Sequence, residues 1–166
     1  SIGFEGNINF QESTFDVFST EYEDVSGYWV VKDEANTDYS SATGVLGAIT
    51  YDVWVSPDGT DESSASGTEQ ESFKTIDYAM SRIFQTADNH ITIYLYAGTY
   101  APSTNGEEFP IRMFSNINLI GQGADVTIIN AEQTDRGMNI VDCKDNIISD
   151  LSISHGSSPD HGGGIH

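Results

Sequence analysis

The pattern of apolar and polar residues changes near residue 50. Before it, short aromatic and β-branched runs at 15–17 and 28–31 are separated by stretches rich in Asp, Glu, Ser and Gly. This pattern is typical of short strands in a loop-rich β region. Residues 32–44 carry almost no large apolar side chain, which predicts a linker or a long surface loop. We therefore expect a short β-rich segment over residues 1–50, which we interpret as the end of a preceding module plus a linker, and a separate region over 51–166.

The second region opens with an alternating strand and a single convincing helix. Residues 51–55 alternate, so Tyr51, Val53 and Val55 are predicted to share one face, opposite Asp52 and Trp54. Turn-forming residues at 56–59 end this strand. A one-sided helix is then predicted, with Ser72 as its N-cap and with apolar positions at three- and four-residue spacing: Phe73, Ile76, Ala79, Met80, Ile83 and Phe84.

From residue 90 onward the apolar runs are short, and they recur at close spacing without helices between them. Their residue numbers are 91–95, 117–120, 126–129, 138–141, 147–149 and 151–153. No Asn-Gly pair directly joins two of these runs, as a tight hairpin would require; the pair at 105–106 is about ten residues from the run on either side. This rhythm favours an all-β solenoid, in which each turn of chain stacks on the last and pairs with it in parallel. A β-sandwich with the same number of strands is the alternative.

Several linked motifs follow one another in the second region. They read Val-Ser-Pro-Asp-Gly at 55–59, Phe-Lys-Thr-Ile at 73–76 and Ala-Gly-Thr-Tyr at 97–100. In this order they resemble the opening of right-handed parallel β-helix proteins of the pectin-lyase-like superfamily. Ser72 and Ala97 stand where the family has proline. The resemblance covers residues 51–166 and implies a right-handed parallel β-helix with one N-terminal capping α-helix. It does not imply one activity, because the superfamily includes lyases, hydrolases, tailspikes and surface proteins without known catalysis.

The C-terminal residues favour a chain that continues as a solenoid. Residues 160–166 look like a Gly-rich turn that enters a new strand. A parallel solenoid that stopped in mid-turn would leave an edge of unpaired N–H and C=O groups. We therefore expect either that the chain is a piece of a longer polypeptide or that a neighbouring subunit covers its open coil.

Charge excludes some partners. The chain has 6 Lys and Arg against 26 Asp and Glu, for a net charge of −20. This balance argues against nucleic acid and anionic membranes as partners, and no apolar stretch is long enough to span a bilayer. The single cysteine, Cys143, is expected to be a small buried residue. Scarce Lys with abundant Ser, Thr, Asn and Gly favours an extracellular or cell-surface protein, with high-salt adaptation as the alternative.

The candidate metal ligands are acidic residues and histidines of the last third of the chain. Asp142, Asp145 and Asp150 lie around one turn, and oxygen-rich groups of this kind suit Ca²⁺. The resemblance adds a second interpretation, since polyuronate lyases of this fold use Ca²⁺ with a basic residue, for which Lys144 and Arg136 are nearby. Solvated turn corners are the plain alternative. We assign no catalytic residue and no certain cofactor; Ca²⁺ is the one that we consider.

A second titratable cluster follows within a glycine-rich stretch. It contains His155, Asp160, His161 and His166, which could bind a transition metal through imidazole. The stretch superficially resembles the Gly-His-Gly of polygalacturonases, but that family also needs paired aspartates upstream, which this sequence lacks. Exposed loop histidines are the simpler interpretation.

The aromatic residues of the early strands are the candidate carbohydrate ligands. Trp54, Tyr94, Tyr96 and Tyr100 could form a platform for sugar rings or could pack beneath the capping helix. The sequence thus predicts a non-catalytic β-helix module for adhesion, carbohydrate contact or surface assembly, with a polysaccharide or cell-surface glycan as its partner. Two alternatives stay open: a polysaccharide lyase or glycoside hydrolase whose catalytic coils lie beyond residue 166, and a homo-oligomeric filament subunit that stacks through its open coil.

Overall fold

The computed structural model describes residues 8–9, 29–31, 37–38, 45–159 and 162–166. The chain divides into two compact units, residues 1–49 and 50–166. In the first unit, strand β1 (Ile8–Asn9) pairs in parallel with β3 (Thr37–Asp38), and β2 (Trp29–Val31) pairs in parallel with β4 (Val45–Gly47). Strand β3 lies within the segment predicted as a linker or loop, so that prediction is wrong there. The predicted strand at 15–17 lies outside the described residues.

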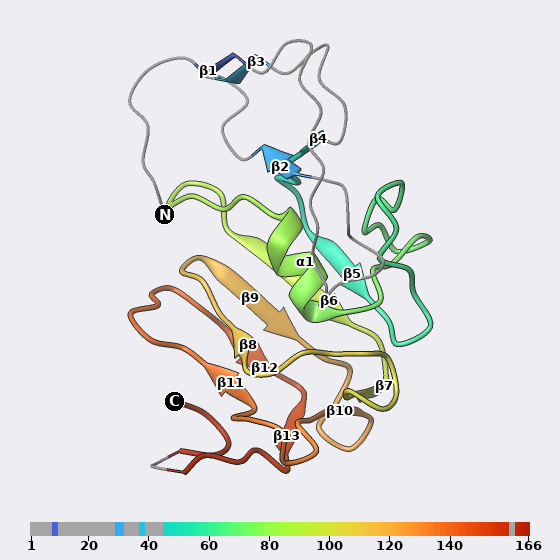
Figure 1. Ribbon diagram of the computed structural model, residues 1–166, viewed down its shortest axis with the longest axis vertical. Coiled ribbons are helices and arrows are strands. Elements are labelled where there is room, and N and C mark those ends of the chain that lie inside the picture. Colours follow the sequence, from blue (N-terminus) through green and yellow to red (C-terminus); the bar gives the residue numbers. More distant parts are fainter. Residues whose placement is uncertain (1–7, 10–28, 32–36, 39–44, 160–161) are drawn as a thin grey trace. The chain divides into compact units, whose positions relative to one another are not determined.

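The second unit consists of short strands and one short helix (Figure 1). Every pairing between its named strands is parallel. Its elements, in chain order, are β5 (Val53–Val55), α1 (Ile76–Arg82), β6 (Ile91–Leu95), β7 (Gly98–Tyr100), β8 (Ile111–Arg112), β9 (Ile117–Ile120), β10 (Thr127–Asn130), β11 (Met138–Asn139), β12 (Ile148–Ser149) and β13 (Ser152–Ser154). The expectation of a mainly β structure with parallel strands is confirmed for this part of the chain.

The strands of this unit form three parallel sheets, which the chain visits in turn. The sheets have the orders β12-β9-β6-β5, β13-β10-β7 and β11-β8, and Ile165 extends the third by pairing with Met138. From β6 to Ile165 the chain passes through the first, second and third sheet three times in that order. Paired positions from β6 onward differ by 24 to 29 in residue number. Each circuit therefore lies on the previous one.

Strand alternation separates a buried row from an outward row in the first sheet. Val53, Ile93 and Leu119 are in register and have no exposed surface. The neighbouring register row consists of half-buried side chains on the opposite face, because successive side chains of a strand point to opposite faces. This second row, which we call the outward row, contains Trp54, Tyr94, Ile120 and Ser149. Tyr51, predicted to share the buried face, precedes β5 and is 49% exposed.

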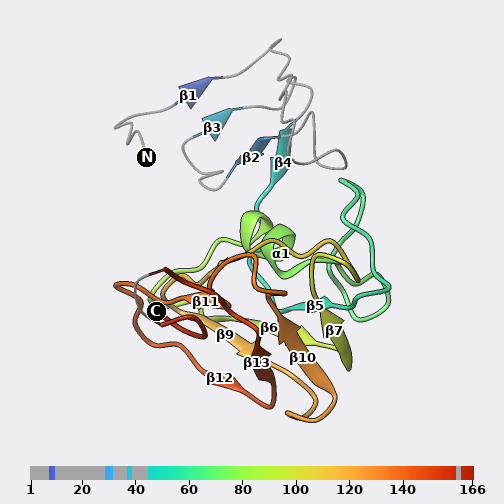
Figure 2. The ribbon, with the colours of Figure 1, turned by 60° about the horizontal axis from the view of Figure 1, so that its bottom comes forward.

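Helix α1 begins later than the sequence predicts. Its N-cap is Thr75 rather than Ser72, and Ile83 is its C-cap. The backbone of Phe73 belongs to the sheet: its N–H donates to the carbonyl of Trp54, and its carbonyl accepts from the N–H of Ser56. These bonds hold Phe73 in extended geometry beside Val55, so the helix cannot start there. Helix α1 contacts β5 and β8, and Figure 2 shows it at the β5 end of the first sheet.

Candidate functional site

The aromatic residues singled out from the sequence lie on the outward side of β5 and β6. The rings of Trp54 and Tyr94 have their centroids 5.1 Å apart and an angle of 31° between their planes. Both are half-buried, as is Tyr96, whose hydroxyl donates to the carbonyl of Glu69. Strand alternation places all three on the same side, because residues 94 and 96 are two positions apart. The parallel pairing of β5 with β6 brings Trp54 to Tyr94 across forty residues of sequence.

Tyr100 has a different environment from the other three aromatic residues. Its side chain has no exposed surface, and its hydroxyl lies 2.9 Å from the carbonyl oxygens of Val55 and Tyr96. Burial, together with the nearby charge of Glu107, raises the pKa of the Tyr100 hydroxyl above its usual value. Tyr100 therefore packs within the core and is not available to a ligand.

Polar side chains form another row beside the outward row, which we call the polar row. The Asp52 carboxylate accepts the N–H of Thr92 at 2.7 Å, and the Asn118 amide donates to the Thr92 hydroxyl at 3.3 Å. The N–H of Ile147 in turn donates to the Asn118 side-chain oxygen at 2.9 Å. These bonds link successive circuits of the chain and hold the sheet that carries the aromatic pair.

Two carboxylates that the sequence analysis missed surround the N-terminus of α1. Asp61 accepts the N–H groups of Lys74 and Thr75 and also the Thr75 hydroxyl, at 2.8, 3.2 and 2.8 Å. Glu107 accepts the N–H groups of Ile76 and Asp77, at 2.8 and 3.0 Å. The first N–H groups of a helix have no partner within it, so both carboxylates supply what the backbone lacks.

Glu107 is the strongly perturbed acid among the described residues. Its side chain is only 1% exposed, and burial raises its pKa to about 8, although its hydrogen bonds to helix N–H groups oppose the shift. Burial also raises the pKa of Asp61. Asn105 supports Glu107 from the side and donates to the carbonyl of Lys74 at 2.8 Å. A perturbed carboxyl often marks a functional site, but here every contact of the group serves to fix the helix.

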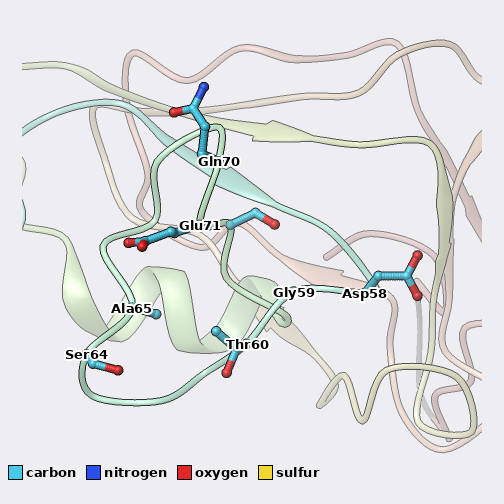
Figure 3. A pocket seen from close by; sticks show the side chains of 8 residues that line it. Asp58, Gly59, Thr60, Ser64, Ala65, Gln70 and Glu71 are labelled. Carbon is cyan, nitrogen blue, oxygen red and sulfur yellow. The ribbon is translucent and has the colours of Figure 1, made fainter.

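A polar cavity of about 410 Å³ lies in the loop between β5 and α1. Figure 3 shows that its side chains come from three stretches of this one loop, at 58–60, 64–65 and 70–72. The lining contains two carboxylates, three hydroxyls and one amide, from Asp58, Glu71, Thr60, Ser64, Ser72 and Gln70, with Gly59 and Ala65 between them. It therefore offers mainly hydrogen-bond acceptors and no cationic side chain.

The residues predicted to bind metal occupy exposed corners. Asp142, Asp145, Asp150 and His155 all have left-handed backbone geometry, with φ between 50° and 58°. Asp tolerates this geometry better than most residues, which gives the three aspartates a backbone role in turning the chain. No group of three or more His, Cys, Asp or Glu residues that could hold a metal ion lies within the described ranges. Asp160 and His161 lie outside those ranges, and the Ca²⁺ prediction remains a prediction.

Cys143 lies at a second, smaller depression, lined by residues of β8, β11 and the segments that follow them. The depression measures about 300 Å³, and Arg112, Phe114 and Val141 contribute to its lining. The Cys143 thiol is half-buried rather than buried, which corrects the sequence prediction, and it donates to the carbonyl of Met113 at 3.1 Å. Burial and the neighbouring Asp142 raise the pKa of this thiol. A raised pKa disfavours the reactive thiolate form.

The basic residues considered for lyase chemistry border the third sheet, whereas the aromatic pair belongs to the first. Lys144 is exposed and follows Cys143, where its N–H donates to the Ser115 hydroxyl. Arg136 is half-buried and immediately precedes β11. Both belong to the third sheet or its corner.

In the described part of the chain, no helix is both long and apolar enough to cross a membrane.

Comparison with known proteins supports the fold more than it informs on activity. Residues 58–139, just under half of the chain, match a family described as "Protein of unknown function (DUF1565)". This family is associated with β-helix proteins, and the match runs from the polar loop through α1 to β11. No curated protein and no solved structure matches the chain. The matched segment is thus similar to a family of β-helix-associated proteins whose description names no activity.

Proposed function

We propose that residues 50–166 form the N-terminal cap and first coils of a right-handed parallel β-helix of the pectin-lyase-like type. Three parallel sheets visited in constant order, with 24 to 29 residues per circuit, support this proposal. The motifs at 55–59, 73–76 and 97–100 support it as well. An experimental structure of the full chain tests it, because a left-handed or open arrangement of the three sheets would contradict it.

We further propose that this unit is a non-catalytic contact surface for carbohydrate on a secreted or cell-surface protein. The observation that carries the proposal is the tilted, half-buried ring pair of Trp54 and Tyr94 on the outward side of a parallel sheet. Sugar sites combine apolar and aromatic surface with a few polar groups that fix orientation. Here Tyr96 and the polar cavity of the neighbouring loop supply such groups.

The environment of the titratable groups favours binding over catalysis. General acid–base catalysis requires a group within hydrogen-bond reach of the substrate. Glu107, the carboxyl whose pKa is raised to about 8, is buried and bonded to Ile76 and Asp77. Its unusual pKa is therefore explained by its structural role, and no substrate can reach it without displacing the start of α1.

Binding of the full chain to a printed array of plant, fungal and bacterial oligosaccharides tests this function. We expect saturable binding of at least one glycan, and we expect Trp54→Ala to weaken it about tenfold, because truncated aromatic anchors often dominate binding. Trp54→Phe keeps an aromatic ring and is the matched control, with a smaller loss. Tyr96→Phe removes only the hydroxyl bonded to Glu69, so its loss of affinity, expected to be smaller than that of Trp54→Ala, measures what this polar group contributes.

Two outcomes contradict the proposal. If no glycan binds, or if Trp54→Ala binds as tightly as the wild type while its circular dichroism is unchanged, the aromatic pair is not a carbohydrate site. If the bound glycan is consumed, and unsaturated uronate or reducing ends appear, the chain is an enzyme rather than a binding module.

A further inference from the structure

The few cationic side chains of this acidic chain are unevenly placed. The chain has 6 Lys and Arg residues, of which Lys32 lies outside the described residues. Arg82 is only 6% exposed, and its guanidinium donates to the Tyr78 hydroxyl at 2.9 Å. The same guanidinium lies 5.8 and 5.6 Å from the ring centroids of Phe73 and Tyr78. These contacts hold Arg82 inside the cap, where it cannot meet a bound glycan.

The other described cationic residues belong neither to the outward row nor to the lining of the loop cavity. The charge of Lys74 acts on Asp61 at the start of α1. Arg112 belongs to β8, Arg136 immediately precedes β11, and Lys144 lies at the corner that follows β11. None of these residues is a member of the outward row or of the polar loop cavity. Within the described residues, the candidate carbohydrate surface therefore contains no positive charge.

Negative groups, in contrast, border this surface at several points. Asp52 lies beside the aromatic pair in the polar row, and Asp150 follows Ser149, whose hydroxyl donates to it at 2.9 Å. The loop cavity adds the carboxylates of Asp58 and Glu71, and Figure 3 shows them on different stretches of the loop. A glycan on this surface meets aromatic rings, hydroxyls, amides and carboxylates.

We infer that the carbohydrate surface around Trp54 and Tyr94 selects neutral glycans and rejects acidic ones, an inference that rests on the proposed function. Uronate or sulfate groups would meet like charge, without a cation to compensate the loss of their hydration. The hydroxyls of a neutral sugar are donors, and carboxylate and amide oxygens accept them. Ca²⁺ bridging of an acidic glycan would need converging ligands, and no group of three forms in the described part of the chain.

Pairs of hexasaccharides that differ only at C6 test this inference. Cellohexaose and mannohexaose carry a CH₂OH group where the corresponding β-1,4-glucuronate and β-1,4-mannuronate hexamers carry a carboxylate. Binding of the full chain is measured by calorimetry at about 20 mM and about 500 mM salt, because salt screens exposed charges. At low salt, we expect the neutral hexamer of a pair to bind at least about tenfold more tightly than its acidic counterpart. The difference should narrow at high salt.

A variant that introduces a positive charge tests the inference through a gain of binding. Ser149 is the half-buried member of the outward row on β12. We expect Ser149→Lys to bind the acidic hexamers several-fold more tightly than Ser149→Gln does, because a single surface charge acts mainly on a charged ligand. Ser149→Gln is the matched control, since it adds a side chain of similar length to the same position without charge, so any steric loss is shared by both variants and both classes of hexamer.

The outcomes separate the inference from the function beneath it. If wild-type protein binds the acidic hexamers as tightly as the neutral ones, or binds them tightly once Ca²⁺ is added, the inference is overturned and the carbohydrate function stands. If Ser149→Lys and Ser149→Gln behave alike toward acidic hexamers, the absence of a cation is not what selects the ligand. If neither class of glycan binds on the array or here, the carbohydrate function itself fails.

Discussion

The two ends of the first sheet differ in how they are covered. At the β5 end, the chain itself closes the edge: the N–H of Trp54 donates to Gly67, and Phe73 pairs with Val55. Among the described residues, no strand lies beyond β12 at the opposite end. The inward side chain of Ile148 is accordingly half-buried, whereas its register partner Leu119 has no exposed surface.

The same difference recurs in the other two sheets. Ile153 is half-buried where its partner Ile129 has no exposed surface, and Ile165 is 50% exposed where its partner Met138 is fully buried. Inward position alone therefore does not bury an apolar side chain in this architecture. Burial requires a neighbouring layer on both sides, as in repeat proteins, whose stability comes from contacts between adjacent repeats.

The largest effect that we predict compares the register partners Ile129 and Ile153. Ile129→Ala should lower the free energy of unfolding by about 2–5 kcal/mol, because it leaves a cavity among fully buried side chains. Ile153→Ala should cost less than about half as much, since part of that side chain already contacts water. Urea denaturation of both variants measures the difference. Equal losses would show that the last circuit is as tightly packed as the one before it.

A second prediction uses pH to examine the cap. Because the pKa of Glu107 is about 8 in the folded chain and near 4.5 when the chain unfolds, the folded state holds an extra proton between these values. The contribution of Glu107 to stability is complete below pH 4.5 and is lost as pH rises through 8. We expect a slope of up to about 1.4 kcal/mol per pH unit in this window. Urea titrations at several pH values measure this slope.

Glu107→Gln removes the titrating group and keeps its size, so stability should depend less on pH than in the wild type. Asp150→Asn makes the same change of charge at an exposed corner and should leave the wild-type slope in place. Comparing the pH slopes of the two variants also cancels the contribution of the other acidic groups, because both variants retain those groups. If the two variants show the same slope, the buried carboxyl does not govern the pH response.

The smallest effect separates the observed helix cap from the predicted one. Thr75→Ala removes the hydroxyl that accepts the Tyr78 N–H and donates to Asp61, and it should cost about 1 kcal/mol. Thr75→Ser keeps the hydroxyl and should recover most of this stability. Ser72→Ala should change stability by less than about 0.5 kcal/mol, because Ser72 is half-buried and does not cap α1. A larger loss of stability in Ser72→Ala than in Thr75→Ala would show that Ser72 caps the helix, as the sequence predicts.

The strands were the more predictable part of the fold. Runs at 91–95 and 117–120 became β6 and β9 without change, because β-branched and aromatic residues favour a packed, pleated surface. Strand β7 is not among the predicted apolar runs, since Gly98 and Thr99 carry little apolar signal. It forms because β10 pairs with it, through residues 127–129. A local sequence pattern cannot predict a contact between segments this far apart in the chain.

The candidate site was only partly predictable. Trp54, Tyr94 and Tyr96 were selected as aromatic residues in strands, but sequence could not place Trp54 beside Tyr94, which is a consequence of strand register. Asp61 and Glu107 were not found at all. Glu107 stands in a polar stretch that resembles any surface loop, and no local signal marks it as buried.

The sequence by itself determined the longer strands, that one helix lies among them and that the chain is strongly acidic. These properties depend on neighbouring residues and on composition, so a linear pattern contains them. Only the tertiary structure decided where the short strands β3, β7 and β8 form, where α1 begins, which carboxylate is buried and which aromatic rings lie together. Each of these depends on residues that are brought together from 14 to 40 positions apart in the chain, as with Asp61 at Thr75, Glu107 at Ile76 and Trp54 at Tyr94. Parallel stacking makes such contacts, and the outcome depends on register rather than on local preference.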